Sequence, residues 1–179
     1  MVVFFLANGF EELEAIAPLD ILRRGGVEVI TAGIGGKVIT GSHGISVACD
    51  KAAEVIFTSE IEGVILPGGM PGTRNLAASQ TVEDALAYCA RKGLLIGAIC
   101  AAPSVLGEQG LLDGREATCF PGFEEKLTGA KLSSEYVVRD GNIITAKGAG
   151  VAAEFGFALL TALKDEETAE TVRRAMQFR

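Results

Sequence analysis

Short apolar runs without a charged residue recur along the chain and predict buried β-strands. They occupy residues 2–6, 64–66 and 94–99 and consist mainly of valine, isoleucine, leucine and phenylalanine. Such runs are typical of parallel strands that are covered on both faces. Residues 10–24 instead have apolar positions at helical spacing, and a second strand pattern follows at residues 27–32. The succession predicts βαβ units and an α/β fold.

The same patterns predict the remaining elements. They predict a hairpin or a pair of edge strands at residues 33–50, and one or two helices at residues 73–92. They also predict a β-hairpin at residues 137–145, an apolar helix at residues 151–163 and a charged amphipathic helix at residues 165–178. Thr81 and Asp165 are the expected helix caps. Asp140-Gly141 predicts a turn with two positive φ angles. Pro18 lies inside the first helix, where it should cause a kink or a break.

Length and composition limit the class of protein. The chain has 179 residues, 49% of them hydrophobic, which predicts a single domain over residues 1–179 with a sizeable core. The net charge of -7 argues against nucleic acid as the main partner, because binding phosphates requires clustered lysine and arginine. No apolar run approaches the ~20 residues of a membrane span, and the chain opens on a strand without a basic leader. We therefore expect a cytoplasmic protein without a membrane partner.

The chain contains four cysteines, Cys49, Cys89, Cys100 and Cys119. Their spacing includes neither a CxxC pair nor a zinc-binding pattern. We therefore expect free thiols in a reducing compartment rather than a disulfide framework or a metal site.

The apolar run at residues 94–99 leads through Cys100 into a helix with Pro103 near its start. Ala98 and Ala102 lie two residues on either side of Cys100, and such small neighbours permit the sharp strand-to-helix turn of a nucleophile elbow. A thiol there would face the amide groups of the new helix, which favour the thiolate. The alternative is that Cys100 is simply a small buried hydrophobic residue.

Three acidic residues open the first predicted helix. Glu11 and Glu12 suit the positive end of the helix dipole, where carboxylates are stabilising. Glu14 either belongs to the same set or points across the C-terminal edge of the sheet, where Cys100 is expected. Beside a thiolate, the carboxyl of Glu14 would be partly desolvated, would stay protonated and would donate a hydrogen bond to the sulfur.

A turn rich in glycine and proline, residues 67–72, follows the strand at residues 64–66. The Gly68 and Gly69 amides form either an ordinary β-to-α turn or an oxyanion hole beside the thiol. The turn matches neither a dinucleotide fingerprint nor a Walker loop. His43, the only histidine, lies on a glycine-flanked loop and is either a solvated surface residue or a catalytic base.

Four ordered motifs resemble the ThiJ/PfpI superfamily, and within it the branch of the human parkinsonism-associated deglycase and its bacterial homologues. The motifs are Glu11-Glu12-Leu13-Glu14, Ile65-Leu66-Pro67-Gly68-Gly69 with Asn75-Leu76, Ala98-Ile99-Cys100-Ala101-Ala102-Pro103, and residues 145–150 before Glu154-Phe155. The resemblance extends over nearly the whole chain. It implies a flavodoxin-like, class I glutamine-amidotransferase-like three-layer sandwich, with a mostly parallel sheet and helices on both faces, that forms a homodimer.

The resemblance also implies roles for single residues. Cys100 matches a nucleophile of low pKa, and Glu14 matches the buried acid that hydrogen-bonds its sulfur. Gly69 and Ala101 match backbone anion donors, and Asp20 matches an acid that supports the pocket wall on the dimer side. Neither a metal nor another cofactor is implied.

Two positions depart from the family pattern. Phe120 stands where many members of this branch have a histidine near the nucleophile, so a Cys-His pair within one subunit is not expected. His43 lies in a loop where relatives often carry an arginine that faces the partner subunit. Protease and amidase chemistry thus loses its general base, and Glu14 would move protons alone unless His43 reaches across the dimer.

Two functions are compatible with these residues. In the first, a glyoxalase III (lyase) or deglycase (hydrolase) uses Cys100 to attack methylglyoxal or early glycation adducts. In the second, a redox-sensing or protective protein is oxidised at Cys100 to a sulfinate that Glu14 stabilises, without turnover. A purely structural protein would leave Cys100 dispensable. The expected partners are a small α-oxoaldehyde or glycated compound and a second copy of the chain.

Overall fold

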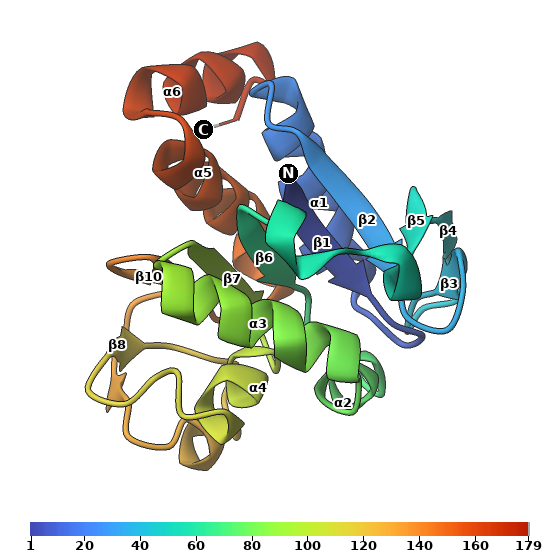
Figure 1. Ribbon diagram of the computed structural model, residues 1–179. Helices are drawn as coiled ribbons and strands as arrows, with labels where there is room; N and C mark the ends of the chain where they lie inside the picture. Colours follow the sequence, from blue (N-terminus) through green and yellow to red (C-terminus); the bar gives the residue numbers. More distant parts are fainter. Residues whose placement is uncertain (179) are drawn as a thin grey trace.

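A seven-stranded sheet lies at the centre of the computed structural model, which describes residues 1–178 (Figure 1). The strands are β1 (Val2–Leu6), β2 (Val29–Gly33), β5 (Lys51–Ala52), β6 (Gly63–Leu66), β7 (Leu95–Ile99), β10 (Val137–Asp140) and β11 (Ile143–Ala146). Their order across the sheet is β10-β11-β7-β6-β1-β2-β5. Each neighbouring pair is parallel except β10 and β11, which form the predicted hairpin.

Helices cover both faces of this sheet (Figure 1). One layer has α1 (Glu12–Arg24), α5 (Ala152–Leu163) and α6 (Glu166–Ala175), and the other has α2 (Gly72–Ala77), α3 (Gln80–Lys92) and α4 (Pro103–Glu108). Successive side chains of β1 enter different layers, because they point to opposite faces of the sheet. Val3 and Phe5 pack in the core with α3, whereas Phe4 and Leu6 pack with α1 and α5. The predicted three-layer α/β sandwich is confirmed.

Two smaller pairs of strands lie outside the main sheet. β3 (Val38–Thr40) and β4 (Ser46–Ala48) are antiparallel and form the hairpin expected within residues 33–50. β8 (Glu116–Ala117) and β9 (Lys131–Leu132) pair in parallel. Short 3-10 helices occupy Ala53–Val55, Thr58–Glu60, Glu124–Lys126 and Ala149–Val151. No helix within residues 1–178 combines the length and the hydropathy that crossing a membrane requires.

The structure differs from the local predictions at two places, and at Pro18 it excludes the predicted break. α1 runs through Pro18 without a break, and a Cβ on Gly156 of α5 would lie 2.9 Å from the Cα of Pro18. Close packing against α5 therefore supports α1 around a residue that cannot donate a backbone hydrogen bond. Ser79, not Thr81, precedes α3, and its side chain makes no capping bond. In the β10–β11 turn only Gly141 has a positive φ, of 60°.

The parallel sheet brings several loops to one edge. The carboxyl ends of β1, β6, β7 and β11 lie there, and the segments after them carry Glu14, Gly69, Cys100 and Gly148, respectively. In α/β proteins this edge is where ligands bind. The strand order thus assembles residues that are far apart in the sequence.

Candidate active site

Cys100 occupies the sharp turn between β7 and α4. Its φ is 64°, in the left-handed region that residues other than glycine rarely adopt. The N–H of Cys100 donates to the carbonyl of Ala146 (2.8 Å), which fixes the turn against β11. Ala98 and Ala102 are fully buried, so larger side chains would not fit beside the turn. The turn has the geometry predicted for a nucleophile elbow, with the Cys100 side chain half-buried.

Glu14 extends from the first turn of α1 to the thiol of Cys100. The residue is only 1% exposed. Its Oε2 accepts a hydrogen bond from the N–H of Gly68 (2.9 Å), and the backbone of Ala149 and the thiol of Cys100 lie close enough to the carboxyl to lower its pKa. Of the two interpretations of Glu14, the structure supports the one that places it at the sheet edge.

Burial governs the protonation of this pair. It raises the pKa of Glu14 from 4.5 to about 7, although hydrogen bonds from Cys100 and Gly68 act in the opposite direction. Burial and the charge of ionised Glu14 raise the pKa of the Cys100 thiol to about 12, and the Ala101 and Gly69 amides only partly oppose them. The direction of the Cys100 pKa is thus opposite to the expected lowering, because burial and Glu14 outweigh the two amides that favour the thiolate. At neutral pH a thiol therefore faces a carboxyl that can gain or lose a proton.

Two backbone amides face the Cys100 sulfur from different loops. They belong to Gly69, which follows β6, and to Ala101, the first residue after the elbow. Gly69 has a φ of 89°, and a Cβ there would overlap the backbone of the loop before α1, so only glycine fits. Gly68 differs from the expectation, because its N–H donates to Glu14 instead of facing the sulfur.

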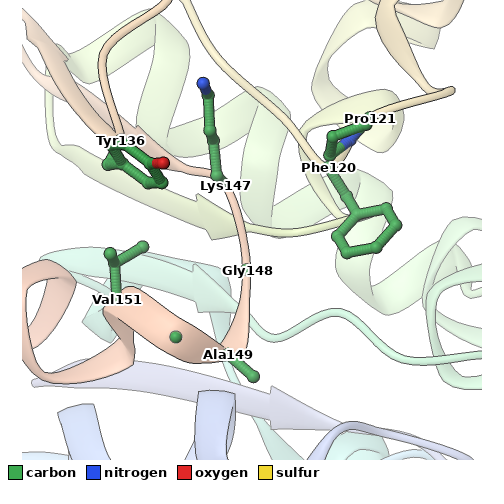
Figure 2. A pocket seen from close by; sticks show the side chains of 8 residues that line it. Phe120, Pro121, Tyr136, Lys147, Gly148, Ala149 and Val151 are labelled. Carbon is green, nitrogen blue, oxygen red and sulfur yellow. The ribbon is translucent and has the colours of Figure 1, made fainter.

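A hollow, here named the side pocket, lies beside this pair (Figure 2). It has a volume of about 450 Å³ and is lined by Phe120, Pro121, Tyr136, Lys147, Gly148, Ala149, Gly150 and Val151. Gly148 lies next to both the ring of Phe120 and the carboxyl of Glu14. A Cβ on this residue would lie 3.2 Å from the ring and 3.8 Å from Glu14 Oε1. The N–H of Phe120 donates to the carbonyl of Cys100 (2.9 Å), so this atypical residue does adjoin the nucleophile.

His43 pairs with the acidic residues at the start of α1. Its Nδ1 lies 2.9 Å from Glu12 Oε2 and 3.1 Å from Glu11 Oε2, and the hydrogen bond to Glu12 and the charge of Glu11 raise its pKa. Burial would raise the pKa of Glu12, but hydrogen bonds from His43 and from the hairpin backbone lower it to about 2. Glu12 therefore holds the β3–β4 hairpin against α1, a role beyond helix-dipole compensation. The three side chains are also close enough to one another to ligate one cation.

Asp20 lies further along α1, outside the Cys100–Glu14 contacts. Its Oδ2 forms an ion pair with Nε of Arg24 (2.8 Å), and both side chains are about half exposed. Within a single subunit its carboxylate is thus engaged at the surface. Support of the pocket wall by Asp20 would require a second copy of the chain.

Sequence reasoning missed part of the site. The resemblance marks residues 145–150 as a motif without giving them a role, whereas the structure places the backbone of Ala149, in a short 3-10 turn, next to the carboxyl of Glu14. The available signal was the position of this segment after β11, which ends at the same sheet edge as the elbow. Tyr136 and Lys147 carry no local signal, since they come from separate segments that only the fold brings to the side pocket.

The fold and the site define a class of protein: a flavodoxin-like, class I glutamine-amidotransferase-like α/β sandwich with a cysteine at its nucleophile elbow. Residues 1–162 match the DJ-1/PfpI family. The chain belongs to this family.

Relatives within the family span nearly the whole chain. Protein dj-1beta of Drosophila melanogaster is 34% identical over 174 residues, 96% of this chain and 93% of that protein. The glutathione-independent glyoxalase DJR-1.2 of Caenorhabditis elegans is 33% identical over 168 residues, 93% of this chain and 89% of that protein. The structure of oxidized Toxoplasma gondii DJ-1 superposes with a TM-score of 0.94 at 31% identity, covering 99% of this chain and 97% of that one. These likenesses confirm the family and the fold that the motifs indicate.

The left-handed backbone at residue 100 predicts that glycine is more stable than alanine at this position, the reverse of the usual order. Cys100→Gly should have a free energy of unfolding about 1 kcal/mol higher than Cys100→Ala, because glycine relieves the strain that alanine retains. Urea denaturation checks this. Ala102, with a φ of -64°, is the matched control, where glycine should be about 1 kcal/mol less stable than alanine. A more stable Cys100→Ala variant would contradict strain at the elbow.

Burial of Glu14 predicts that Glu14→Gln becomes more stable relative to wild type as the pH rises. Because the folded-state pKa of Glu14, about 7, exceeds its ordinary 4.5, its contribution to stability is full below pH 4.5 and is lost as pH rises through 7. The variant does not titrate, so its stability relative to wild type should rise by about 3 kcal/mol between pH 4.5 and 8. Urea denaturation across this range measures the difference.

The same comparison in a Cys100→Ala background is the control. The pH-dependent gain should persist there, because burial, not the thiol, is the largest cause of the Glu14 shift. A difference that does not vary with pH would mean that Glu14 titrates at its ordinary pKa in the folded protein.

Proposed function

We propose that this protein is a cofactor-independent glyoxalase that converts methylglyoxal, or a related small α-oxoaldehyde, to the 2-hydroxy acid with Cys100 as nucleophile. The observation that carries the proposal is the buried carboxyl of Glu14, whose pKa of about 7 lets it accept and return a proton at neutral pH beside the thiol. Further support comes from the C. elegans relative, which is a glutathione-independent glyoxalase.

The first half of the reaction forms a hemithioacetal. Ionised Glu14 takes the proton of the Cys100 thiol as the sulfur adds to the aldehyde carbon. The electron pair of the carbonyl moves to its oxygen, and the Gly69 and Ala101 amides lie where they can donate to this oxyanion. Glu14 then protonates the oxygen and is ionised again. Because Glu14 removes the proton during attack, the reaction does not depend on a pre-formed thiolate.

The second half moves a hydrogen between neighbouring carbons. Glu14 removes the proton from the former aldehyde carbon, which gives an enediolate, and delivers this proton to the former ketone carbon. The hydroxyl proton on the first carbon passes to the oxygen of the second, so that the first carbon becomes a thioester carbonyl and the second an alcohol. Water then cleaves the thioester, which releases the 2-hydroxy acid and restores the Cys100 thiol. One water is added overall, and the oxidation of one carbon balances the reduction of the other. The reaction therefore needs no external electron acceptor.

Early glycation adducts are the second proposed substrate. A hemithioacetal or aminocarbinol formed from methylglyoxal contains the same oxidised carbon pair that the site would process. A deglycase activity would use the same Cys100 and Glu14, with the thiol or amine of the adduct as leaving group. It would release the same 2-hydroxy acid.

A redox-sensing role is the alternative. The Toxoplasma gondii DJ-1 structure, similar over 99% of this chain, is of an oxidized protein, and Cys100 is accessible in part to solvent. Oxidation to a sulfinate would be stabilised by a hydrogen bond from Glu14. The raised pKa of Cys100 weighs against rapid oxidation, since the thiolate is the reactive form. We therefore place this function second.

Turnover of methylglyoxal tests the proposal. Cys100→Ser and Glu14→Gln should each lower kcat/KM for lactate formation at least ~100-fold, because each removes a group that acts in the transition state. In wild type, kcat/KM should rise with pH through about 7, where Glu14 becomes ionised. Lactate is measured in metal-free and thiol-free buffer.

The exposed Glu83 of α3 provides the control, and Glu83→Gln should retain activity. Absence of lactate with the wild-type protein would refute the glyoxalase proposal. Conversion of Cys100 to a sulfinate by dilute peroxide, seen by mass spectrometry of that same protein, would then favour the redox role.

Free thiols support a cytoplasmic location. Cys49, Cys89 and Cys119 are buried and unpaired, and Cys100 is half-buried and also free. Such thiols persist in a reducing compartment. We therefore infer that the protein works in the cytoplasm.

A homodimer built on α1 is the proposed assembly. Leu13 and Ile16 of α1 are 56% and 40% exposed, and Ile45 of the neighbouring hairpin is 59% exposed. Glu12 Oε1 accepts from the N–H of Ile45 (3.4 Å), so these apolar side chains belong to one region beside the site. Contiguous exposed apolar residues of this kind are typical of protein interfaces.

Sedimentation of an α1 variant tests the dimer. A Leu13→Glu, Ile16→Glu double variant should sediment as a monomer at micromolar concentration, because it places charges in the apolar contact. Phe57→Glu is the control, since Phe57 is 68% exposed outside α1 and the hairpin, and this variant should stay dimeric. Wild-type protein that sediments as a monomer would exclude the assembly.

A further inference from the structure

The side pocket is larger than methylglyoxal requires. Its volume of about 450 Å³ falls within the range of about 300–1,000 Å³ that is usual for sites of larger small-molecule ligands. Methylglyoxal has only five non-hydrogen atoms. A ligand that fills the pocket while its reactive carbon lies at Cys100 must therefore carry a sizeable substituent.

Some residues that line the side pocket also contact Glu14 or Cys100. The backbone of Ala149 lies beside the carboxyl of Glu14, and the neighbouring Gly148 lies next to both this carboxyl and the ring of Phe120. Phe120 is itself hydrogen-bonded through its backbone to the carbonyl of Cys100. A Cβ on Gly148 would lie 3.2 Å from the Phe120 ring and 3.8 Å from Glu14 Oε1, so the side pocket and the carboxyl adjoin the same glycine. The side pocket therefore neighbours the Cys100–Glu14 pair through Gly148, Ala149 and Phe120.

The walls of the side pocket suit a flat apolar group. The rings of Phe120 and Tyr136 lie on opposite sides, and Val151 lies below Tyr136 (Figure 2). Phe120 is 47% exposed and Tyr136 is 64% exposed, so both have ring surface free for a ligand. The ammonium of Lys147 is held by the carbonyl of Ser134 (2.7 Å) and lies 4.7 Å from the Tyr136 ring centre. Rings attract both another ring and a fixed cation.

We propose that the side pocket binds the aryl group of compounds that react at Cys100, so that aryl-substituted α-oxoaldehydes are among the substrates. The assignment of substrates rests on the glyoxalase function proposed above, whereas the aryl site itself rests on the pocket. Phe120 and Tyr136 are the residues that determine this specificity.

Turnover of two oxoaldehydes tests the substrate class. The ratio of kcat/KM for phenylglyoxal to that for methylglyoxal should fall roughly threefold to tenfold in Tyr136→Leu and in Phe120→Leu, the effect of losing one ring contact. Leucine keeps an apolar side chain and removes only the ring. Phe57→Leu, which changes an exposed ring outside the side pocket, should keep the wild-type ratio.

Alkylation of Cys100 tests the aryl site without turnover. Iodoacetanilide and iodoacetamide both transfer a carbon to sulfur with loss of iodide, but only the first has an aryl group. The ratio of their rates at Cys100, followed by mass spectrometry of the Cys100 peptide, should exceed the ratio for free N-acetylcysteine about threefold or more. Tyr136→Leu and Phe120→Leu should each bring it back toward the free-thiol value.

The two experiments separate the possible failures. If neither oxoaldehyde reacts but the alkylation ratio responds to both ring variants, the glyoxalase function fails and the aryl site stands. If methylglyoxal is converted but neither the kcat/KM ratio nor the alkylation ratio changes in Tyr136→Leu and Phe120→Leu, the aryl site is overturned and the glyoxalase function stands. An alkylation ratio equal to that of the free thiol also overturns the aryl site.

Discussion

The contact between the buried carboxyl of Glu14 and the thiol of Cys100 is the interaction on which the site depends. Removal of a carboxylate from water is costly, and the fold offsets this with the amide of Gly68 and the backbone of Ala149. These groups come from the loops after β6 and β11, so the pair exists only where the ends of parallel strands meet. The resulting pKa of about 7 makes Glu14 suitable for proton transfer in both directions.

Backbone geometry at two positions serves this contact. Cys100, at a φ of 64°, is strained, and the hydrogen bond to Ala146 holds it in a conformation that presents its sulfur at the sheet edge. Gly69, at a φ of 89°, lets its loop approach the segment before α1 and aim an amide at the same sulfur. The strained backbone of Cys100 and the missing side chain of Gly69 thus both serve to place polar groups around the same sulfur.

The two sides of this site differ in burial and polarity. The acid-base side is closed, because Glu14 is almost fully buried and the backbone of Gly68 and Ala149 adjoins its carboxyl. The other side is open and apolar, with the rings of Phe120 and Tyr136 exposed in the side pocket. Gly148 is the link between them. The side chains of Phe120 and Tyr136 make no contact with Glu14 that sets its pKa.

Local sequence patterns determined most of the strands, though not the two-residue β5 and β9, as well as the cap of α6 at Asp165 and the turn at Cys100, because periodicity, caps and small neighbours act between residues close in the chain. The motif resemblance also placed Glu14 beside the sulfur. Only the tertiary structure decided that Gly68 binds Glu14 across 54 positions, that the pKa of Cys100 is raised, and which residues line the side pocket. Burial and long-range contacts set these properties, and neither is encoded in a local pattern.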